Sequence, residues 1–224
     1  MPTVSIQING TRIRLALPRE EGVKWDYIGV FLEDLYGLAR LKPSILTVLD
    51  VGGNAGLFST AARHYFPEAK IHCYEPNPQV HQFACVQARH CDFDLFPEAI
   101  GGRNGFVSME FPAGTDSNLG RTVEERNGSI PRVAFRDAIA RMGEEVDLLK
   151  LDCEGAEWEL FKQADCWPLV RSLTMEYHLF CGETHQQLRR TVEGLGFSVR
   201  NHVYTETSHS GHVQASNRRF GARG

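Results

Sequence analysis

Residues 48–58 read Val-Leu-Asp-Val-Gly-Gly-Asn-Ala-Gly-Leu-Phe, an apolar run that enters a glycine-rich turn ahead of a helical pattern. Glycines allow a ligand to approach the backbone of such a turn, and the N–H groups of the following helix face that ligand. The segment therefore predicts a nucleotide-type pocket. It fails the dinucleotide fingerprint G-x-G-x-x-G, because Asn54 and Leu57 take the third and sixth places, and it lacks the Gly-Lys-Ser/Thr ending of a P-loop. A tight turn without a ligand is the alternative for this segment alone.

Short apolar runs alternate with helical patterns after this turn, which is typical of a parallel sheet covered by helices on both faces. Residues 102–130 interrupt the alternation with three glycine-containing turns, and we expect a short strand at Phe106–Phe111 and a mobile loop there. The expected strands are residues 46–51, 71–74, 93–96, 146–151, 173–177 and 197–203, and the expected helices are residues 56–65, 78–90, 136–142, 155–162 and 184–194.

The first 41 residues carry a different pattern. Apolar and polar residues alternate on both sides of Asn9-Gly10, which predicts a β-hairpin. Apolar positions then recur at helical spacing from Lys24 to Leu41, which predicts one amphipathic helix that ends before Pro43. We therefore divide the chain into residues 1–41, a hairpin and cap helix, and residues 42–224, the ligand-binding domain.

Two acidic residues follow expected strands. Glu75 ends the second strand of the domain, where an acid in a doubly wound sheet accepts hydrogen bonds from ribose hydroxyls. Asp152 ends the run Val146–Leu151, at the edge where open α/β sheets bind ligands. The alternatives are a solvated strand end for Glu75 and helix capping for the acids at Asp152, Glu154 and Glu157.

Composition narrows the class of protein. The chain has 224 residues, of which 42% are apolar and 23% charged, with a net charge of −4. These values describe an ordinary globular protein and argue against a nucleic-acid partner. No apolar run is long enough for a membrane helix and the N-terminus has no signal-peptide pattern, so we expect a cytoplasmic protein without a membrane partner. The six cysteines are scattered without zinc-type spacing.

Three segments together resemble a known family. Asp-Val-Gly-Gly-Asn-Ala-Gly at residues 50–56, Tyr-Glu-Pro-Asn-Pro at 74–78 and Leu-Leu-Lys-Leu-Asp-Cys-Glu-Gly-Ala-Glu at 148–157 resemble the FkbM family of class I methyltransferases. The resemblance covers residues 32–178. It implies a Rossmann-like α/β fold with a mostly parallel seven-stranded sheet and helices on both faces, and its antiparallel last strand would lie at about residues 212–220.

The resemblance also implies S-adenosylmethionine as the cofactor and, usually, O-methylation of hydroxyls on sugars or polyketide-type natural products. The expected acceptor is therefore a small-molecule hydroxyl. A methyltransferase for a peptide or amine nitrogen, and a non-catalytic adenosine-binding partner subunit, remain alternatives, and a homo-oligomer is left open. The residues expected to bind the cofactor are Asp50, Gly52, Gly53, Asn54, Gly56, Glu75, Ile100 and Asp152.

A hydroxyl is a poor nucleophile until its proton is removed, so a general base worth roughly 10² to 10⁴ in rate is expected. The candidates are Asp152 and, after the fifth strand, Glu176 and His178. Our hypothesis is that His178 takes the proton while Asp152 or Glu176 orients it. A structural histidine is the alternative. In a rival arrangement the same three side chains hold Mg²⁺, although no spacing compels a metal, and we favour a metal-free site.

Overall fold

The computed structural model describes residues 3–8, 11–42, 44–111, 116, 120–125, 127–180 and 182–220. Within these residues the main sheet has seven strands in the order β12-β13-β11-β10-β3-β4-β5. Adjacent strands from β11 to β5 are parallel, whereas β13 is antiparallel to both of its neighbours. The strands are β3 (Thr47–Val51), β4 (Lys70–Tyr74), β5 (Asp94–Phe96), β10 (Val146–Leu151), β11 (Val170–His178), β12 (Phe197–Thr205) and β13 (Ser210–Asn217).

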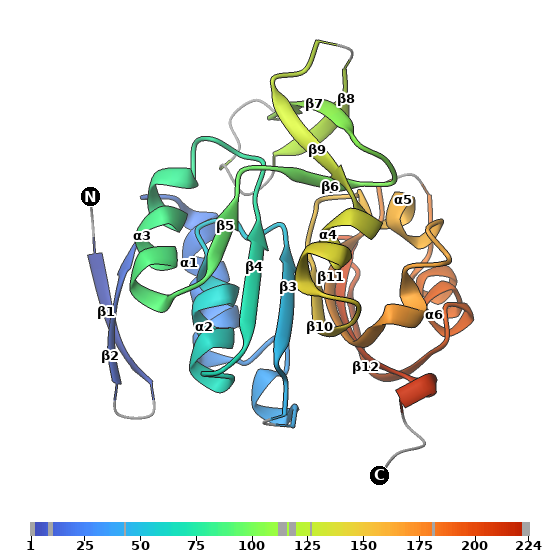
Figure 1. The fold of residues 1–224 in the computed structure, drawn as a ribbon, viewed down its shortest axis with the longest axis horizontal. Helices are drawn as coiled ribbons and strands as arrows, with labels where there is room; N and C mark the ends of the chain where they lie inside the picture. Colours follow the sequence, from blue (N-terminus) through green and yellow to red (C-terminus); the bar gives the residue numbers. More distant parts are fainter. Residues whose placement is uncertain are drawn as a thin grey trace.

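Helices cover both faces of this sheet (Figure 1). The central strands are mostly apolar because they contribute to two cores: Leu148 of β10 packs in the core on the α2 side, and the adjacent Leu149 packs in the core on the α4 side. The α/β fold expected from the sequence is thereby confirmed. The helices of the two layers are α2 (Leu57–Tyr65) and α3 (His81–Cys91) on one face, and α4 (Phe135–Met142), α5 (Glu157–Phe161) and α6 (His185–Gly194) on the other.

Element bounds shift by up to three residues from the expected ones, as at β11, which begins at Val170 rather than Leu173. The last strand, expected at about residues 212–220, is β13, and a short 3-10 helix follows it at Arg218–Phe220. The N-terminal hairpin is present as β1 (Thr3–Ile8) and β2 (Thr11–Ala16), and its expected turn at residues 9 and 10 lies outside the described residues.

The single helix expected at residues 24–41 is wrong. Helix α1 (Glu21–Tyr27) continues as a π-helical turn at Ile28–Leu32, and a 3-10 turn follows only at Leu38–Arg40. The helix ends because Asp34 adopts a left-handed conformation with φ 48°, from which its carboxylate accepts hydrogen bonds from the N–H groups of Leu38 and Ala39. Asp readily makes such local bonds, so the side chain competes with the helix that the apolar spacing predicts.

The segment expected to be a short strand and a loop forms a second sheet in the order β6-β9-β7-β8. It stands beyond the end of the main sheet (Figure 1). The expected strand is β7 (Gly105–Glu110), while β6 (Ala99–Gly101), β8 (Arg121–Glu124) and β9 (Ile130–Ala134) were not expected. Of the expected mobile loop, residues 112–115, 117–119 and 126 lie outside the described residues.

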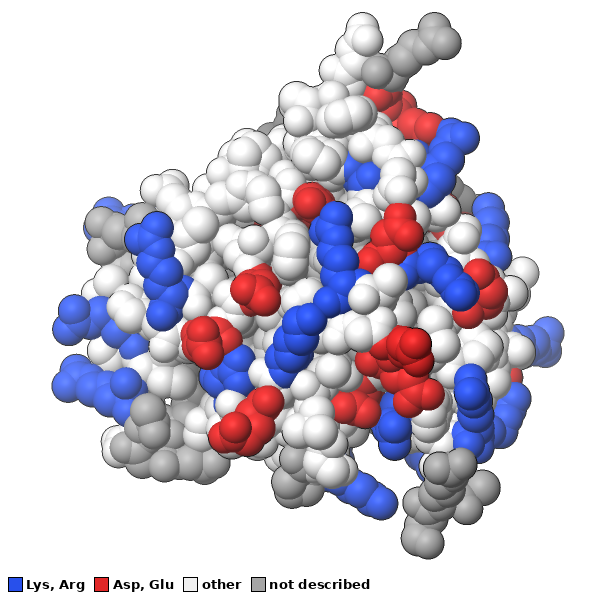
Figure 2. All heavy atoms as spheres, in the orientation of Figure 1, with Lys and Arg blue, Asp and Glu red and all other residues white. Residues whose placement is uncertain are grey.

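Charged side chains of both signs are interspersed on the face seen in Figure 2. None of the helices in the described ranges is long and apolar enough to cross a membrane.

The glycine-rich turn is closely enclosed by its neighbours. A Cβ atom on Gly52 would overlap the backbone carbonyl oxygen of Asp152, and one on Gly53 would overlap the Sγ atom of Cys73. Gly52 also has φ 78°. These glycines are therefore required by the packing of the turn against β4 and β10, whether or not a ligand is bound.

We expect Gly53→Ala to lower the free energy of unfolding by about 1–3 kcal/mol, because it overpacks a buried site. The double variant Gly53→Ala/Cys73→Ala should be less destabilised than the sum of its single changes, since it removes the atom that clashes. Gly194→Ala, where a Cβ has open space, is the matched control and should leave stability nearly unchanged. Urea unfolding of the wild type, the single variants Gly53→Ala and Cys73→Ala, the double variant and the control measures these changes, and an additive double variant would contradict the packing explanation.

Candidate active site

A cavity of about 260 Å³ opens at the carboxyl ends of the central strands. Its floor is the turn at residues 51–55, and its walls include Glu75 after β4, Asp152 after β10, and Glu176 and His178 at the end of β11. The N-terminal segment and the second sheet also contribute to the lining. Residues far apart in the sequence therefore meet at the edge where open α/β sheets bind ligands.

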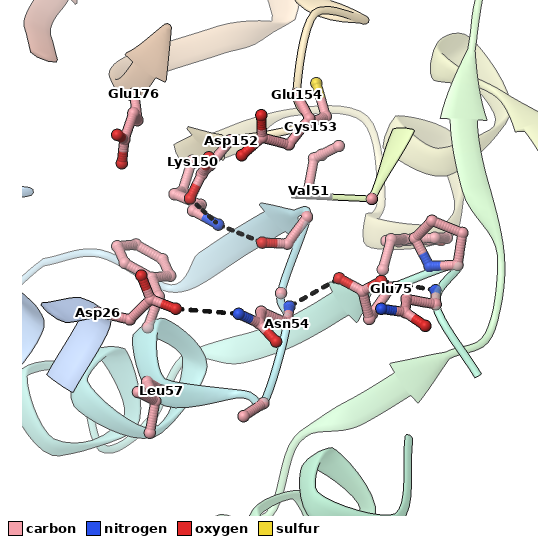
Figure 3. Close-up of a pocket in the computed structure, with 18 of the residues that line it drawn as sticks. Asp26, Val51, Asn54, Leu57, Glu75, Lys150, Asp152, Cys153, Glu154 and Glu176 are labelled. Carbon is pink, nitrogen blue, oxygen red and sulfur yellow. Dashed lines mark hydrogen bonds and ion pairs between the residues drawn. The ribbon is translucent and has the colours of Figure 1, made fainter. Parts of the chain in front are cut away.

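Asn54 connects two sides of this cavity (Figure 3). It has φ 46°, a left-handed conformation that Asn tolerates better than most residues. Its backbone N–H donates to Oε2 of Glu75 at 2.7 Å, and its side-chain Nδ2 donates to Oδ2 of Asp26 at 2.9 Å. Asn54 thus occupies the expected position of a central glycine and also fixes two carboxylates.

The carboxylate of Glu75 is only 6% exposed. Burial raises its pKa to about 7, although hydrogen bonds from the N–H groups of Asn77 and Asn54 act in the opposite direction. These two donors engage one oxygen each, at 2.6 and 2.7 Å. Since a carboxylate oxygen has two lone pairs, each oxygen can accept one further hydrogen bond. Glu75 is therefore oriented to receive a pair of hydroxyl groups from a ligand in the cavity.

Lys150 lies beneath the floor of the cavity, and sequence analysis missed it. The only signal was a lysine between the apolar residues Leu149 and Leu151 of a strand, and it is 2% exposed. Its Nζ donates to the carbonyl oxygen of Gly52 and lies 3.2 Å from Oδ1 of Asp50 and 3.5 Å from Oδ2 of Asp152. Burial alone would lower the pKa of this amine, but the two aspartates outweigh burial and raise it, so Lys150 stays charged.

Six of the eight expected cofactor-binding residues line the cavity: Gly52, Gly53, Asn54, Glu75, Ile100 and Asp152. Asp50 and Gly56 do not. The Asp50 side chain is fully buried. There it accepts a hydrogen bond from Oγ of Ser59 at 2.6 Å and pairs with Lys150, which compensates for its removal from water. Gly56 is the residue that precedes helix α2, has φ 79° and lies next to Phe93. These two residues support the cavity without lining it, and their contact with the cofactor stays a prediction.

Tyr36 is a second residue that sequence analysis missed. Its hydroxyl donates to Oδ2 of Asp152 at 3.0 Å, and its carbonyl oxygen accepts from Oγ1 of Thr174 at 2.9 Å. Its ring packs edge-on against Phe58, with centroids 5.1 Å apart. Burial and the charge of Asp152 raise the phenol pKa well above its ordinary value. Tyr36 is therefore a permanent donor that fixes Asp152 from the N-terminal segment.

The three candidate catalytic side chains meet as expected at one end of the cavity. His178 places Nε2 at 3.8 Å from Oε1 of Glu176, and its ring stacks on Phe180 with centroids 5.3 Å apart. Glu176 also accepts from Nε2 of His212 at 3.2 Å. The imidazole is thus held by an aromatic ring on its face and a carboxylate at its edge.

Glu154 joins this group unexpectedly. Its Oε2 lies 3.7 Å from Nδ1 of His178, a buried ring nitrogen that has no hydrogen-bond partner among the described residues. Burial raises the pKa of Glu154 to about 9, with further contributions from Asp152 and neighbouring carboxylates. Single ligand atoms of Asp152, Glu154 and His178 lie within 4.8 Å of one another, which is a set that a divalent cation could use. The metal alternative from the sequence had named Glu176 where the structure has Glu154.

The chain is similar in sequence and in fold to known methyltransferases. The methyltransferase FkbM domain matches residues 50–199. The methyltransferase sdnD of Sordaria araneosa is 28% identical over 213 residues, which cover 77% of this chain and 81% of the relative. Methyltransferase 1 of Beauveria bassiana is 22% identical over 205 residues, covering 76% and 79%. Among solved structures, Aeropyrum pernix fibrillarin in complex with S-adenosylmethionine has a TM-score of 0.57 and 14% identity, covering 95% of this chain and 82% of that one.

The match to the methyltransferase FkbM domain and to the two methyltransferase relatives defines an S-adenosylmethionine-dependent methyltransferase, and its fold is similar to that of the solved class I structure. The chain belongs to the FkbM methyltransferase family, whose domain covers more than half of its length.

Lys150→Met should lower the free energy of unfolding by about 3–5 kcal/mol, because it leaves Asp50 buried without its counter-charge. Adding Asp50→Asn should recover part of that loss. Lys162→Met, at an exposed position, is the control and should change stability little. A loss below about 1 kcal/mol for Lys150→Met in urea unfolding would mean that the buried charges are not coupled.

The ionisation of the Asp26 carboxyl group can be tested by varying the pH. Burial, then Asp152 and Glu176, raise its pKa from 3.8 to about 7, so the folded state must ionise it against a penalty that the unfolded state lacks. The wild type therefore loses stability relative to Asp26→Asn as pH rises from about 4 to 7, by at most about 1.4 kcal/mol per pH unit. Urea unfolding across this range measures the difference. Parallel curves for the two proteins would rule out the shifted ionisation, and Glu21→Gln on the same helix should give a curve parallel to the wild type.

Proposed function

We propose that this protein transfers the methyl group of S-adenosylmethionine to a hydroxyl group of a small molecule. The observation that carries the proposal is the arrangement of one cavity: Glu75 at one end, the glycine-rich turn in the middle, and Asp152, Glu176 and His178 at the other end. The first end suits a ribose and the last suits proton removal, so the methyl group would be transferred between them.

The cofactor's adenosine would lie on the β4 side of the cavity. The two free acceptor positions of Glu75 suit the two ribose hydroxyls, and Ile100, only 5% exposed, offers an apolar wall for the adenine ring. The turn from Gly52 to Asn54 would run beneath the methionine portion. S-adenosylmethionine supplies a methyl group on a positively charged sulfur, and the carboxylates of Asp152 and Glu176 provide a favourable electrostatic environment for that charge.

The chain's own contribution to the transfer is alignment and proton removal. Fixed alignment of two reactants can supply on the order of 7 to 11 kcal/mol. Tyr36 and Lys150 hold Asp152 from two sides, so the side chain that borders both the cofactor and the acceptor is fixed before either binds.

His178 would take the proton from the acceptor hydroxyl. Histidine is the side chain that most often acts as a general base in enzymes. Phe180 fixes the plane of its ring, and the carboxylate of Glu176 would stabilise the imidazolium that forms. Asp152 and Glu176 would orient the acceptor or the imidazole.

A second arrangement for the same reaction is favoured by one observation, the clustering of Asp152, Glu154 and His178 within 4.8 Å. A divalent cation held there would lower the pKa of a bound hydroxyl. Glu154 would then be essential, whereas in the general-base arrangement it only borders His178.

Methyl transfer from label-carrying S-adenosylmethionine to a panel of hydroxylated sugars and polyketide-type alcohols tests the proposal. On the substrate found, His178→Ala should lower kcat by roughly 10² to 10⁴ at neutral pH. The exposed His90→Ala is the matched control and should retain wild-type kcat. A kcat for His178→Ala within about threefold of wild type would contradict the assignment of the base.

The same assay separates the two arrangements. The general-base arrangement predicts full activity in EDTA, whereas cation-assisted transfer predicts a loss that added Mg²⁺ restores. Amine substrates in the panel test the alternative acceptor, and binding of S-adenosylhomocysteine without any methyl transfer would favour a non-catalytic module.

A further inference from the structure

Asp26 of helix α1 differs from three other carboxylates that line the cavity, Glu75, Asp152 and Glu176. Glu75 accepts two backbone N–H groups, Asp152 pairs with Lys150, and Glu176 pairs with histidines. Asp26, by contrast, has a single polar partner among the described residues, the neutral side-chain amide of Asn54, and that amide engages only Oδ2. The other oxygen, Oδ1, is free to accept hydrogen bonds from a ligand.

The position of Asp26 along the cavity indicates which part of a ligand it meets. Figure 3 shows Asp26 and Glu75 on opposite sides of Asn54, each bound to that residue. A ligand whose ribose lies on Glu75 and whose chain crosses the glycine-rich turn therefore extends its far end towards Asp26. In S-adenosylmethionine that far end is the amino acid, which carries an ammonium group and a carboxylate.

The surroundings of Asp26 favour the ammonium over a neutral or negative group. The nearby charges of Asp152 and Glu176 are negative, and the nearest positive charge, Lys150, is already engaged by two aspartates and a carbonyl oxygen. An ammonium can donate hydrogen bonds to a carboxylate, whereas a sulfonium has no proton to donate. A charge-assisted hydrogen bond to the ammonium would supply the counter-charge that Asp26 lacks.

A complementary group for the other half of the amino acid lies across the turn. Within the described part of the chain no side chain caps helix α2, which begins at Leu57, and both Leu57 and Phe58 line the cavity. Free N–H groups at a helix N-terminus favour a carboxylate. The two ends of a zwitterion thus have separate partners on α1 and α2.

We propose that the carboxylate of Asp26 binds the ammonium group at the methionine end of S-adenosylmethionine. This inference rests on the proposed function, because it takes the cofactor to lie in this cavity with its ribose on Glu75. It makes the N-terminal segment part of the cofactor site rather than only a wall for the acceptor.

Calorimetric titration with two ligands tests the proposal. S-adenosylhomocysteine carries the amino acid, whereas 5′-methylthioadenosine has the same nucleoside and sulfur without it. Asp26→Asn keeps the size of the side chain and removes its charge. We expect this change to raise the Kd of S-adenosylhomocysteine by about 10-fold or more and the Kd of 5′-methylthioadenosine by less than about twofold. Glu21→Gln, an exposed carboxylate-to-amide change on the same helix, should alter neither.

The outcomes are distinguishable. An unchanged Kd of S-adenosylhomocysteine in Asp26→Asn would overturn this inference and leave the proposed function standing. An equal weakening of both ligands would also overturn it, since the change would then act through the turn and not through the ammonium. If neither ligand bound the wild-type protein, the cofactor site itself would be contradicted. Thermal unfolding of each variant verifies that it is folded at the temperature of the titration.

Discussion

The buried ammonium of Lys150 is the interaction on which the geometry of this site depends. It joins Asp50 of β3, Asp152 after β10 and the carbonyl oxygen of Gly52 in the turn, and so fixes two neighbouring strand ends and the loop between them. Removing three charges from water is costly, and the arrangement is stable only because each has a partner within about 3.5 Å. Two aspartates share one lysine, which leaves negative charge at the floor of a cavity suited to a positively charged cofactor. Stability and function thus use the same side chains.

A series of short contacts connects Lys150 to the residues that line the cavity. Close packing against Asp152 and Cys73 holds the turn in place, and the turn presents Asn54, which in turn orients Glu75 on one side and Asp26 on the other. Tyr36 secures Asp152 from the N-terminal segment. The part of the cavity that we propose for the cofactor is therefore held by fixed contacts, whereas Met109 and Thr122 of the second sheet also line the cavity.

The sequence predicted the parts of this site that follow from strand periodicity. Because the carboxyl ends of parallel strands share one edge, locating Glu75, Asp152, Glu176 and His178 after apolar runs was enough to bring them together. It did not predict Asp26, Tyr36 or Glu154, which depend on where irregular segments dock. The break at Asp34, which redirects the chain so that Tyr36 reaches Asp152, is a local side-chain-to-backbone bond that outweighs apolar spacing. Lys150 was visible only as one polar position in a strand, and its two partners come from different strand ends. The strand β8 was missed because its alternating charged and apolar residues are not buried, and β9 was missed because Pro131 interrupts a short apolar run.

A structure of the protein with S-adenosylhomocysteine tests directly whether the cofactor lies in this cavity. We expect the ribose hydroxyls on the carboxylate of Glu75, the adenine beside Ile100, and the sulfur between the glycine-rich turn and Asp152, with Lys150 still bound to both aspartates. A nucleoside found elsewhere on the molecule, or a cavity closed by the side chains of Glu75 and Asp152, would contradict it.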